Sequence, residues 1–370
     1  MMSCIIPPFF RITIGIPALS IIAQTSLDFA PSDRDKISEI KANYFAVKQS
    51  LIESAKKRKM MPFVASLMVE LDLDREYWES VIYEYRTRNS VAKEQLDDVF
   101  SALKANGIEQ CYPIENFAAL LISDADIAMF ASGDIDIYAG HANHGAIHRV
   151  MTGLGYDRTV FNEYQCYYYK KEDLPVGINM MWMWQSRKNM PFHTAFDQKN
   201  LRGGYKENIP LLPADKLMYM CLLHASVHRY ICSPGIKLYY DIGLLAETGV
   251  NWHSVLRFAE EDGYLTRIKI STLCASRFLH IPIPQWVFQA SDYEKERNQK
   301  ILGKLQDKEG HFIKDVTALR LMQIEAFSDD VSLMHKGLQI LFPEPEWIRK
   351  KYTISLPLGY LRNILSGPGG

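Results

Sequence analysis

Hydrophobic periodicity changes twice along this chain of 370 residues, and the two changes restrict its fold more than any other feature of the sequence. Residues 31–110 carry apolar side chains at spacings of three and four, which is typical of amphipathic helices. Residues 108–200 hold short β-like runs with one helix-like piece between them, and helical spacing returns from Pro213 onward. A few strands enclosed by helical regions predict an α+β fold with a small mixed sheet.

The expected elements follow this division of the chain. The β-like runs are Phe117–Ile122, Ile135–Tyr138, Cys166–Tyr169 and Ile178–Trp184, with a helix from about 143 to 154. Helices are expected through Ile37–Leu51, from about Asp74, through Leu96–Leu103, and at about 213–227, 236–248, 252–261, 264–279 and 312–340. The predicted regions are an apolar arm (1–30), an N-terminal helical region (31–110), an α+β core (111–205), a C-terminal helical region (206–341) and a proline-bearing tail (342–370).

Charge and cysteine content narrow the expected partners. The 43 acidic and 42 basic residues nearly cancel, so the sequence indicates no general attraction to nucleic acid or to an anionic membrane. The six cysteines lack Cys-x-x-Cys spacing, which favours reduced thiols over a zinc site or a disulfide framework. The apolar segment Ile12–Ala23 is too short to span a bilayer as a helix. We therefore expect a cytoplasmic protein without a membrane span.

The pentapeptide Gly133–Ile137, with the sequence GDIDI, is the sharpest chemical signal. In a strand, residues two apart point to the same face, so Asp134 and Asp136 project together while Ile135 and Ile137 enter the core. Two adjacent carboxylates repel each other unless a cation lies between them, and Mg²⁺ prefers such oxygen ligands. The alternative is a solvated turn at a strand start, since an Asp-x-Asp triplet alone is common.

Histidine pairs and triplets give weaker signals. His141, His144 and His148 would share one face of a helix, where solvated or capping roles compete with metal binding or a contact to substrate phosphate. His224 and His228 have the spacing of zinc-protease helices, but Ala225 stands where such a helix carries glutamate, which argues against a metalloprotease. The sequence contains neither a Walker loop nor a Gly-x-Gly-x-x-Gly motif, so P-loop and NAD-binding functions lack support.

Several features in a fixed order resemble one protein family. They are a helix ending at Leu103–Ile108, the run Ala119–Ile122, the acids Asp134 and Asp136, Gly155–Tyr156, Asn179–Trp182, and a later helical part with His224, His228, Lys237, Asp241, Leu244, Leu245 and Trp252. In this order, from about Tyr85 to the tail, the chain resembles a bacterial family of uncharacterised nucleotidyltransferases related to the polymerase-beta-like superfamily.

The resemblance implies transfer of a nucleoside monophosphate from an NTP to an acceptor such as a sugar, a small metabolite or a peptide. It implies Mg²⁺ (or Mn²⁺) on Asp134 and Asp136, which with Asn179 would form the catalytic set. The residues that it places near the nucleotide are Ser123, Gly133, His224, Lys237 and Asp241.

Two departures from the family pattern leave the catalytic status open. The family's Lys-Gly position is assigned to Ser123–Asp124, where Asp124 would repel a triphosphate. The third carboxylate of the superfamily is replaced by Asn179, which can ligate a metal but carries no charge. The first alternative is therefore a non-catalytic nucleotide-binding or assembly protein. The second is an Asp-x-Asp glycosyltransferase, which the helical residues before the motif disfavour.

Overall fold

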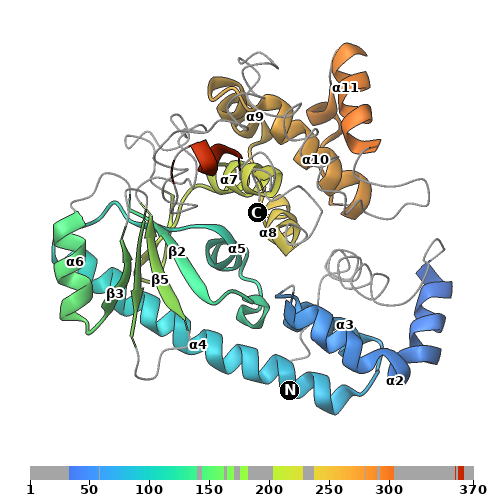
Figure 1. Ribbon diagram of the computed structural model, residues 1–370, viewed down its shortest axis with the longest axis horizontal. Helices are drawn as coiled ribbons and strands as arrows, with labels where there is room; N and C mark the ends of the chain where they lie inside the picture. The colour runs from blue at the N-terminus through green and yellow to red at the C-terminus, as the bar shows by residue number, and fades with distance from the viewer. Residues whose placement is uncertain are drawn as a thin grey trace.

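The fold is α+β, with a small mixed sheet flanked by helices, as the sequence predicts (Figure 1). The computed structural model describes residues 33–57, 59–139, 144–161, 165–170, 176–181, 203–227, 237–279, 281–289 and 292–303, together with 355 and 357–361. The predicted helix at about 312–340 and the residues His141, His228, Trp182 and Trp184 lie outside this part of the chain. Within the described residues, no helix is long and apolar enough to cross a membrane.

Three helices form the N-terminal region: α2 (Asp33–Lys57), α3 (Met61–Glu70) and α4 (Arg75–Ala105). Helix α4 runs without interruption through the two helices expected from Asp74 and through Leu96–Leu103. Its buried residues recur at helical spacing, including Trp78, Val81, Ala92, Leu96, Val99 and Leu103. The helix ends at Ala105, within the expected range Leu103–Ile108, and Gly107 adopts a positive φ of 73° just after the last turn.

The main sheet has five strands in the order β1-β2-β5-β4-β3. They are β1 (Tyr112–Pro113), β2 (Asp134–Tyr138), β3 (Asp157–Phe161), β4 (Gln165–Tyr169) and β5 (Gly177–Met181). Strands β2 and β5 are parallel, and the other neighbours are antiparallel. A separate hairpin pairs β6 (Tyr205–Lys206) with β7 (Ile209–Pro210). Because β2 and β5 lie inside the sheet, each has a strand on both sides.

One expected strand is a helix. The run Phe117–Ile122 lies within α5 (Glu115–Ser123), so the strand prediction for these residues is wrong. Five consecutive residues, from Phe117 to Leu121, are buried, so the run shows neither the alternation of a strand nor a polar face. A short apolar run of this kind does not distinguish a buried helix from a buried strand. The strand that precedes α5 is β1, only two residues long.

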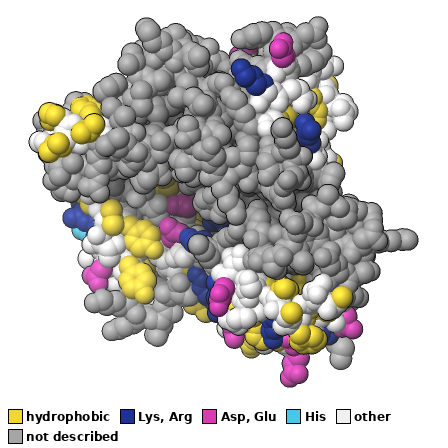
Figure 2. Space-filling view, turned by 45° about the vertical axis from the view of Figure 1, so that its right-hand side comes forward, with side chains coloured by type: hydrophobic (Ala, Val, Ile, Leu, Met, Phe, Trp, Pro, Cys, Tyr) yellow, Lys and Arg dark blue, Asp and Glu magenta, His cyan; other side chains and the backbone are white. Residues whose placement is uncertain are grey.

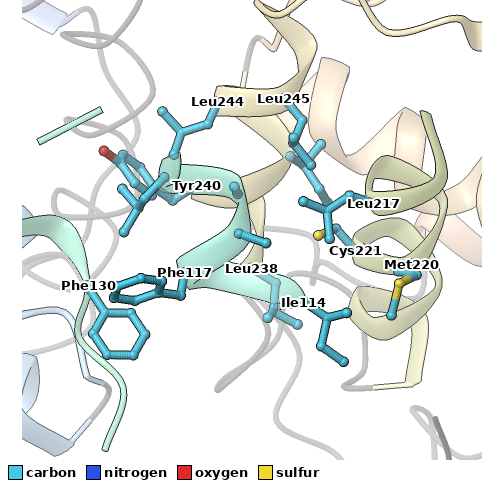
Figure 3. Close-up of a cluster of buried hydrophobic side chains, with 14 of the residues drawn as sticks. Ile114, Phe117, Phe130, Leu217, Met220, Cys221, Leu238, Tyr240, Leu244 and Leu245 are labelled. Atoms are coloured by element: carbon cyan, nitrogen blue, oxygen red, sulfur yellow. The ribbon is translucent and has the colours of Figure 1, made fainter. Parts of the chain in front are cut away.

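The remaining helices are α6 (His144–Gly153), α7 (Ala214–Val227), α8 (Leu238–Ala246), α9 (Trp252–Glu261), α10 (Leu265–Leu279) and α11 (Asp292–Gly303), with short 3-10 turns η1 at Ile127–Met129 and η4 at Gln285–Phe288. Helices α6 to α10 follow the predicted order closely, whereas α11 and the two short turns were not among the expected helices. Figure 3 shows how α5 packs: Phe117 meets Phe130 on one side, and Ile114 lies near Leu238 of α8 and Met220 of α7. This apolar cluster fixes α5 between the sheet and the C-terminal helices.

The two faces of the main sheet differ in character. Buried apolar side chains line one face: Ile135, Ile137, Cys166, Tyr168, Ile178 and Met180. Helices α4 and α6 lie against this side, where Gln95 donates to the carbonyl of Val176 (3.2 Å) and the Tyr168 ring stacks on His148. The intervening residues of the same strands, most of them polar or aromatic, turn to the opposite face. Figure 2 shows acidic and basic side chains side by side on the molecular surface, in keeping with the balanced charge.

Candidate active site

Asp134 and Asp136 lie two residues apart on β2, and both are partly exposed, whereas Ile135 and Ile137 are fully buried. This alternation confirms that the two acids share a face of one strand. The Ser132 hydroxyl donates to Asp134 at 2.9 Å, which orients that carboxylate. The two-residue period of a strand is therefore enough to predict, from the sequence, that the two carboxylates lie on the same face.

Asn179 lies beside Asp136 on the neighbouring strand. The parallel register of β2 and β5 pairs Asp136 with Asn179, and the amide nitrogen of Asn179 donates to Asp136 Oδ1 at 2.7 Å. Asn179 is only 7% exposed, and its Oδ1 is buried without a hydrogen-bond partner among the described residues. A buried acceptor of this kind is costly unless it binds something. The structure thus brings the predicted trio of Asp134, Asp136 and Asn179 together.

Glu115 is a site residue that the sequence analysis missed. The backbone N–H of Ile114 donates to the carbonyl of Asp136 at 2.9 Å, which places the first residue of α5 directly beside the acid pair. Glu115 adopts a left-handed backbone with φ of 59°, an uncommon conformation for this residue type. Its carboxylate lies 3.0 Å from Nδ1 of His224 on α7. No local signal in the sequence marks Glu115, because its neighbours come from β2 and α7.

Burial and the neighbouring acids raise the proton affinity of Asp136. Burial is the main cause that raises the pKa of Asp136 well above its usual value, and the negative charges of Glu115 and Asp134 add to it. The hydrogen bond from Asn179 and the positive charge of Lys237 act in the opposite direction. A bound cation would favour the charged form of Asp136 and relieve the repulsion among the acids.

Asp241 on α8 extends this network into the C-terminal helices. It is 1% exposed and accepts a hydrogen bond from the side-chain amide of Asn116. Burial raises the pKa of Asp241 to about 7, although Asn116, Lys237 and His224 oppose the shift. Three residues expected near the nucleotide, His224, Lys237 and Asp241, therefore act on the same network at the start of α5.

Tyr167 of β4 is a second residue that the sequence analysis missed. It pairs with Asn179 across β4 and β5, on the same face as the acids. Its hydroxyl lies over Gly177, where a Cβ would be only 2.0 Å from that oxygen. Gly177 pairs in turn with Asp134. A glycine at 177 therefore makes room for the Tyr167 ring above the strand that carries the acid pair.

Comparison with known proteins identifies the family. The model of a family described as uncharacterised nucleotidyltransferases matches residues 48–280, which is more than half of the chain. The chain belongs to this family. Neither a curated protein nor a solved structure gives a match. The matched residues include β2, β5, α5, α7 and α8, so every predicted site residue lies within the family region.

The structure removes the reason for placing the family's Lys-Gly pair at Ser123–Asp124. In the family pattern that pair follows a strand, but residues 119–122, the expected strand, are helical. The strand that precedes them is β1, which ends at Pro113 and is followed by Ile114 and Glu115. An acidic side chain therefore stands at the start of α5, beside the acid pair.

Ser123 lies at the other end of α5 and is not part of this cluster. Its hydroxyl donates to the carbonyl of Ala119 at 2.7 Å, and Asp124 forms an ion pair with Lys206 of the small hairpin. An α-helix rises 1.5 Å per residue, which puts Ser123 about 12 Å from Glu115 along the axis. Gly133, by contrast, directly precedes Asp134, and a Cβ there would meet nothing within 4 Å.

The donor set suits a magnesium ion better than a fully protein-ligated metal. Among the described residues, no group of three His, Cys, Asp or Glu side chains is arranged to hold a metal ion. Mg²⁺ commonly binds through one or two carboxylates and completes its shell with water and substrate phosphates. Asp134, Asp136 and the unpartnered oxygen of Asn179 fit that pattern.

Proposed function

We propose that this nucleotidyltransferase moves a nucleoside monophosphate from a magnesium-bound NTP to the hydroxyl of an acceptor, with Asp134 and Asp136 as metal ligands. The observation that carries the proposal is the shared face of the two acids, with the buried, unpartnered oxygen of Asn179 next to them. Mg²⁺ (or Mn²⁺) at this position would neutralise charge on the phosphates during transfer.

The roles of the protein groups follow from their places. Lys237 and His224 lie on the α7–α8 side of the acids, where positive charge would hold the triphosphate. Asn179 positions Asp136 through its hydrogen bond and offers a neutral oxygen. The acceptor oxygen forms a bond to the α-phosphorus, the bond from that phosphorus to the bridging oxygen breaks, and pyrophosphate leaves with the electron pair. The hydroxyl proton passes to solvent or to a site carboxylate.

A second candidate is binding of a nucleotide without transfer. Two observations favour it: Asn179 lacks the charge of a third carboxylate, and Glu115 places a negative charge at the start of α5. A helix N-terminus ordinarily favours phosphate, and an acid there offsets that preference. The two candidates share the metal–nucleotide site and differ only in turnover.

One experiment tests the shared site. Binding of each of the four NTPs is measured by calorimetry with Mg²⁺ and with EDTA, for the wild type and for Asp136→Ala. Metal-dependent binding that becomes about 100-fold weaker in the variant supports the proposal. This loss of affinity corresponds to about 2.7 kcal/mol of binding free energy. Equal affinity in the two proteins, or binding that ignores Mg²⁺, would refute it. Pyrophosphate release then separates transfer from binding alone.

A further inference from the structure

A groove lies next to the acid pair on the side of α4. It has a volume of about 410 Å³ and is lined by Glu84, Tyr85 and Arg88 of α4 and by Ala131, Ser132 and Gly133. This volume lies in the range of small-molecule sites. Asp134 lies next to this lining, because Ser132 donates to its carboxylate and Gly133 is the residue before it.

The groove is held in a defined shape by α4. The Arg88 guanidinium donates to the carbonyl of Ser132 at 2.6 Å, and the amide of Asn89 donates to the carbonyls of Ile127 and Phe130. These bonds attach the segment that leads into Asp134 to the helix. A ligand in the groove would therefore meet a prearranged surface, which lowers the entropic cost of binding.

Charge and shape indicate what the groove accepts. Arg88 and Tyr85 are each partly buried, whereas Glu84 is exposed at the rim. Burial lowers the pKa of the Arg88 guanidinium, but an arginine stays charged at neutral pH. An anion that reaches Arg88 would stabilise a cation that has lost part of its hydration. Tyr85 adds a ring face, and the absence of a side chain at Gly133 leaves space beside Asp134.

The place of the groove separates it from the expected triphosphate position. Lys237 acts on Asp136 and His224 lies beside Glu115, whereas the groove is lined by Tyr85 and Arg88. These two residues belong to α4, which runs on another side of the sheet from α7 and α8 (Figure 1). Phosphoryl transfer requires the attacking and leaving oxygens to be roughly in line on opposite sides of the α-phosphorus. If pyrophosphate leaves toward Lys237, the attacking hydroxyl enters from elsewhere.

We propose that this groove binds the acceptor, and that the acceptor is a small hydroxylated molecule with a carboxylate or phosphate group held by Arg88. The inference rests on the proposed nucleotidyl transfer, because it assigns the second substrate of that reaction. The acceptor hydroxyl lies toward Asp134, and the anionic group lies deeper along α4. The product is a phosphodiester between the acceptor oxygen and the nucleoside monophosphate, with pyrophosphate and one proton released.

Two glycines allow a matched test. Gly133→Leu fills the groove, and Gly153→Leu adds the same side chain at the end of α6. A Cβ meets nothing within 4 Å at either position, both glycines are exposed, and neither has a positive φ, so both variants should fold. Arg88→Gln is a third variant that removes the charge and keeps an amide donor for Ser132.

The probes are glycerol 3-phosphate, lactate and glycerol, which present a hydroxyl with a phosphate, with a carboxylate and with no charge. Calorimetry is run on each protein in the presence of Mg²⁺. We expect one or both anionic probes to bind the wild type and Gly153→Leu equally, and to bind Gly133→Leu and Arg88→Gln at least tenfold more weakly. The anion that binds identifies the class of acceptor. Binding that Gly133→Leu leaves unchanged, equal binding of glycerol, or no binding of either anion would overturn the inference.

Nucleotide binding distinguishes this failure from failure of the proposed function. If Mg-NTP binds in an Asp136-dependent way but neither anion does, the metal–nucleotide site stands and the acceptor groove is wrong. If the anions bind through Gly133 and Arg88 but no nucleotide binds, the groove is an anion site without an acceptor role, and the inference also fails.

Discussion

The two faces of the central sheet use the same strands for opposite purposes. On one face, Ile135, Ile137, Ile178 and Met180 are completely buried and hold the sheet against helices. On the other, Asp134, Asp136 and Asn179 bring together charges and an unpartnered oxygen that add little to stability. Under the proposed function, the residues that would bind the metal stand one position away from the buried residues that hold the sheet against helices.

Replacement of a residue on the apolar face gives the largest expected effect on stability. Ile137→Ala removes a fully buried side chain from an inner strand and should lower the free energy of unfolding by about 2–5 kcal/mol. Asp134→Asn, three residues earlier on the other face, should change it by less than about 1 kcal/mol. Urea unfolding of both variants measures the contrast. If Asp134→Asn lowered the free energy of unfolding as much as Ile137→Ala, the acid face would contribute to stability as much as the apolar face, and the comparison would be wrong.

The buried carboxyl group of Asp241 on α8 is expected to lower the free energy of unfolding at neutral pH. Its pKa is raised from 3.8 to about 7, so the folded state holds a proton that the unfolded chain releases between these values. Stability should therefore fall as pH rises from about 4 to about 7, by a contribution of order 4 kcal/mol in total.

The variant Asp241→Asn isolates this contribution. Asparagine keeps an oxygen that can accept from Asn116 but cannot ionise. Unfolding measured at pH 4, 5.5 and 7 should show the variant gaining on the wild type as pH rises. A constant difference between the two proteins across this range would mean that Asp241 has an ordinary pKa. Asp262→Asn serves as a control, because that carboxylate accepts from Tyr219 away from the acid pair.

The Tyr167–Gly177 contact lies on the face of the sheet that carries the acids, over the backbone of β5. Gly177→Ala would place a Cβ against the Tyr167 hydroxyl, so the ring must move, which should weaken binding of Mg-NTP about three- to tenfold, or about 1 kcal/mol. The double variant Gly177→Ala/Tyr167→Leu removes the ring, whose hydroxyl, Cζ and Cε1 would lie 2.0, 2.3 and 2.7 Å from the new Cβ, and should recover part of the loss if the clash is its cause. Calorimetry on the single and double variants measures this. No loss in the single variant would show that the ring position is irrelevant to the ligand.

How much of this arrangement the sequence predicts depends on the range of the interaction. The shared face of Asp134 and Asp136 follows from the two-residue period of a strand, and the helices from α6 to α10 follow from apolar spacing. Helix α5 was missed because its short apolar run is buried on every side. Glu115 and Tyr167 were missed because their contacts depend on packing and strand register, which one sequence does not display.

The pairing of Asn179 with Asp136 gives the last prediction. It tests whether catalysis is limited because Asn179 stands where a third carboxylate would lie. Asn179→Asp changes almost no volume, so packing stays nearly constant and the added charge is the main variable. Without metal the variant loses the hydrogen bond to Asp136 and gains repulsion, so its thermal stability should fall. Mg²⁺ should restore that stability, because the cation then binds three acids instead of two. If transfer is limited by the missing third carboxylate, pyrophosphate release with a competent acceptor should rise about tenfold, which needs only about 1.4 kcal/mol off the barrier.

Gln165→Glu is the matched control for Asn179→Asp. Gln165 lies on the same face of the sheet, with its Oε1 3.5 Å from the Asn179 amide, and its new charge is one strand further from Asp136. A gain in both variants would indicate a general effect of charge. Brisk turnover by the wild type, with no gain in Asn179→Asp, would show that Asn179 is no defect and that another residue, with Glu115 the nearest candidate, supplies the third acid.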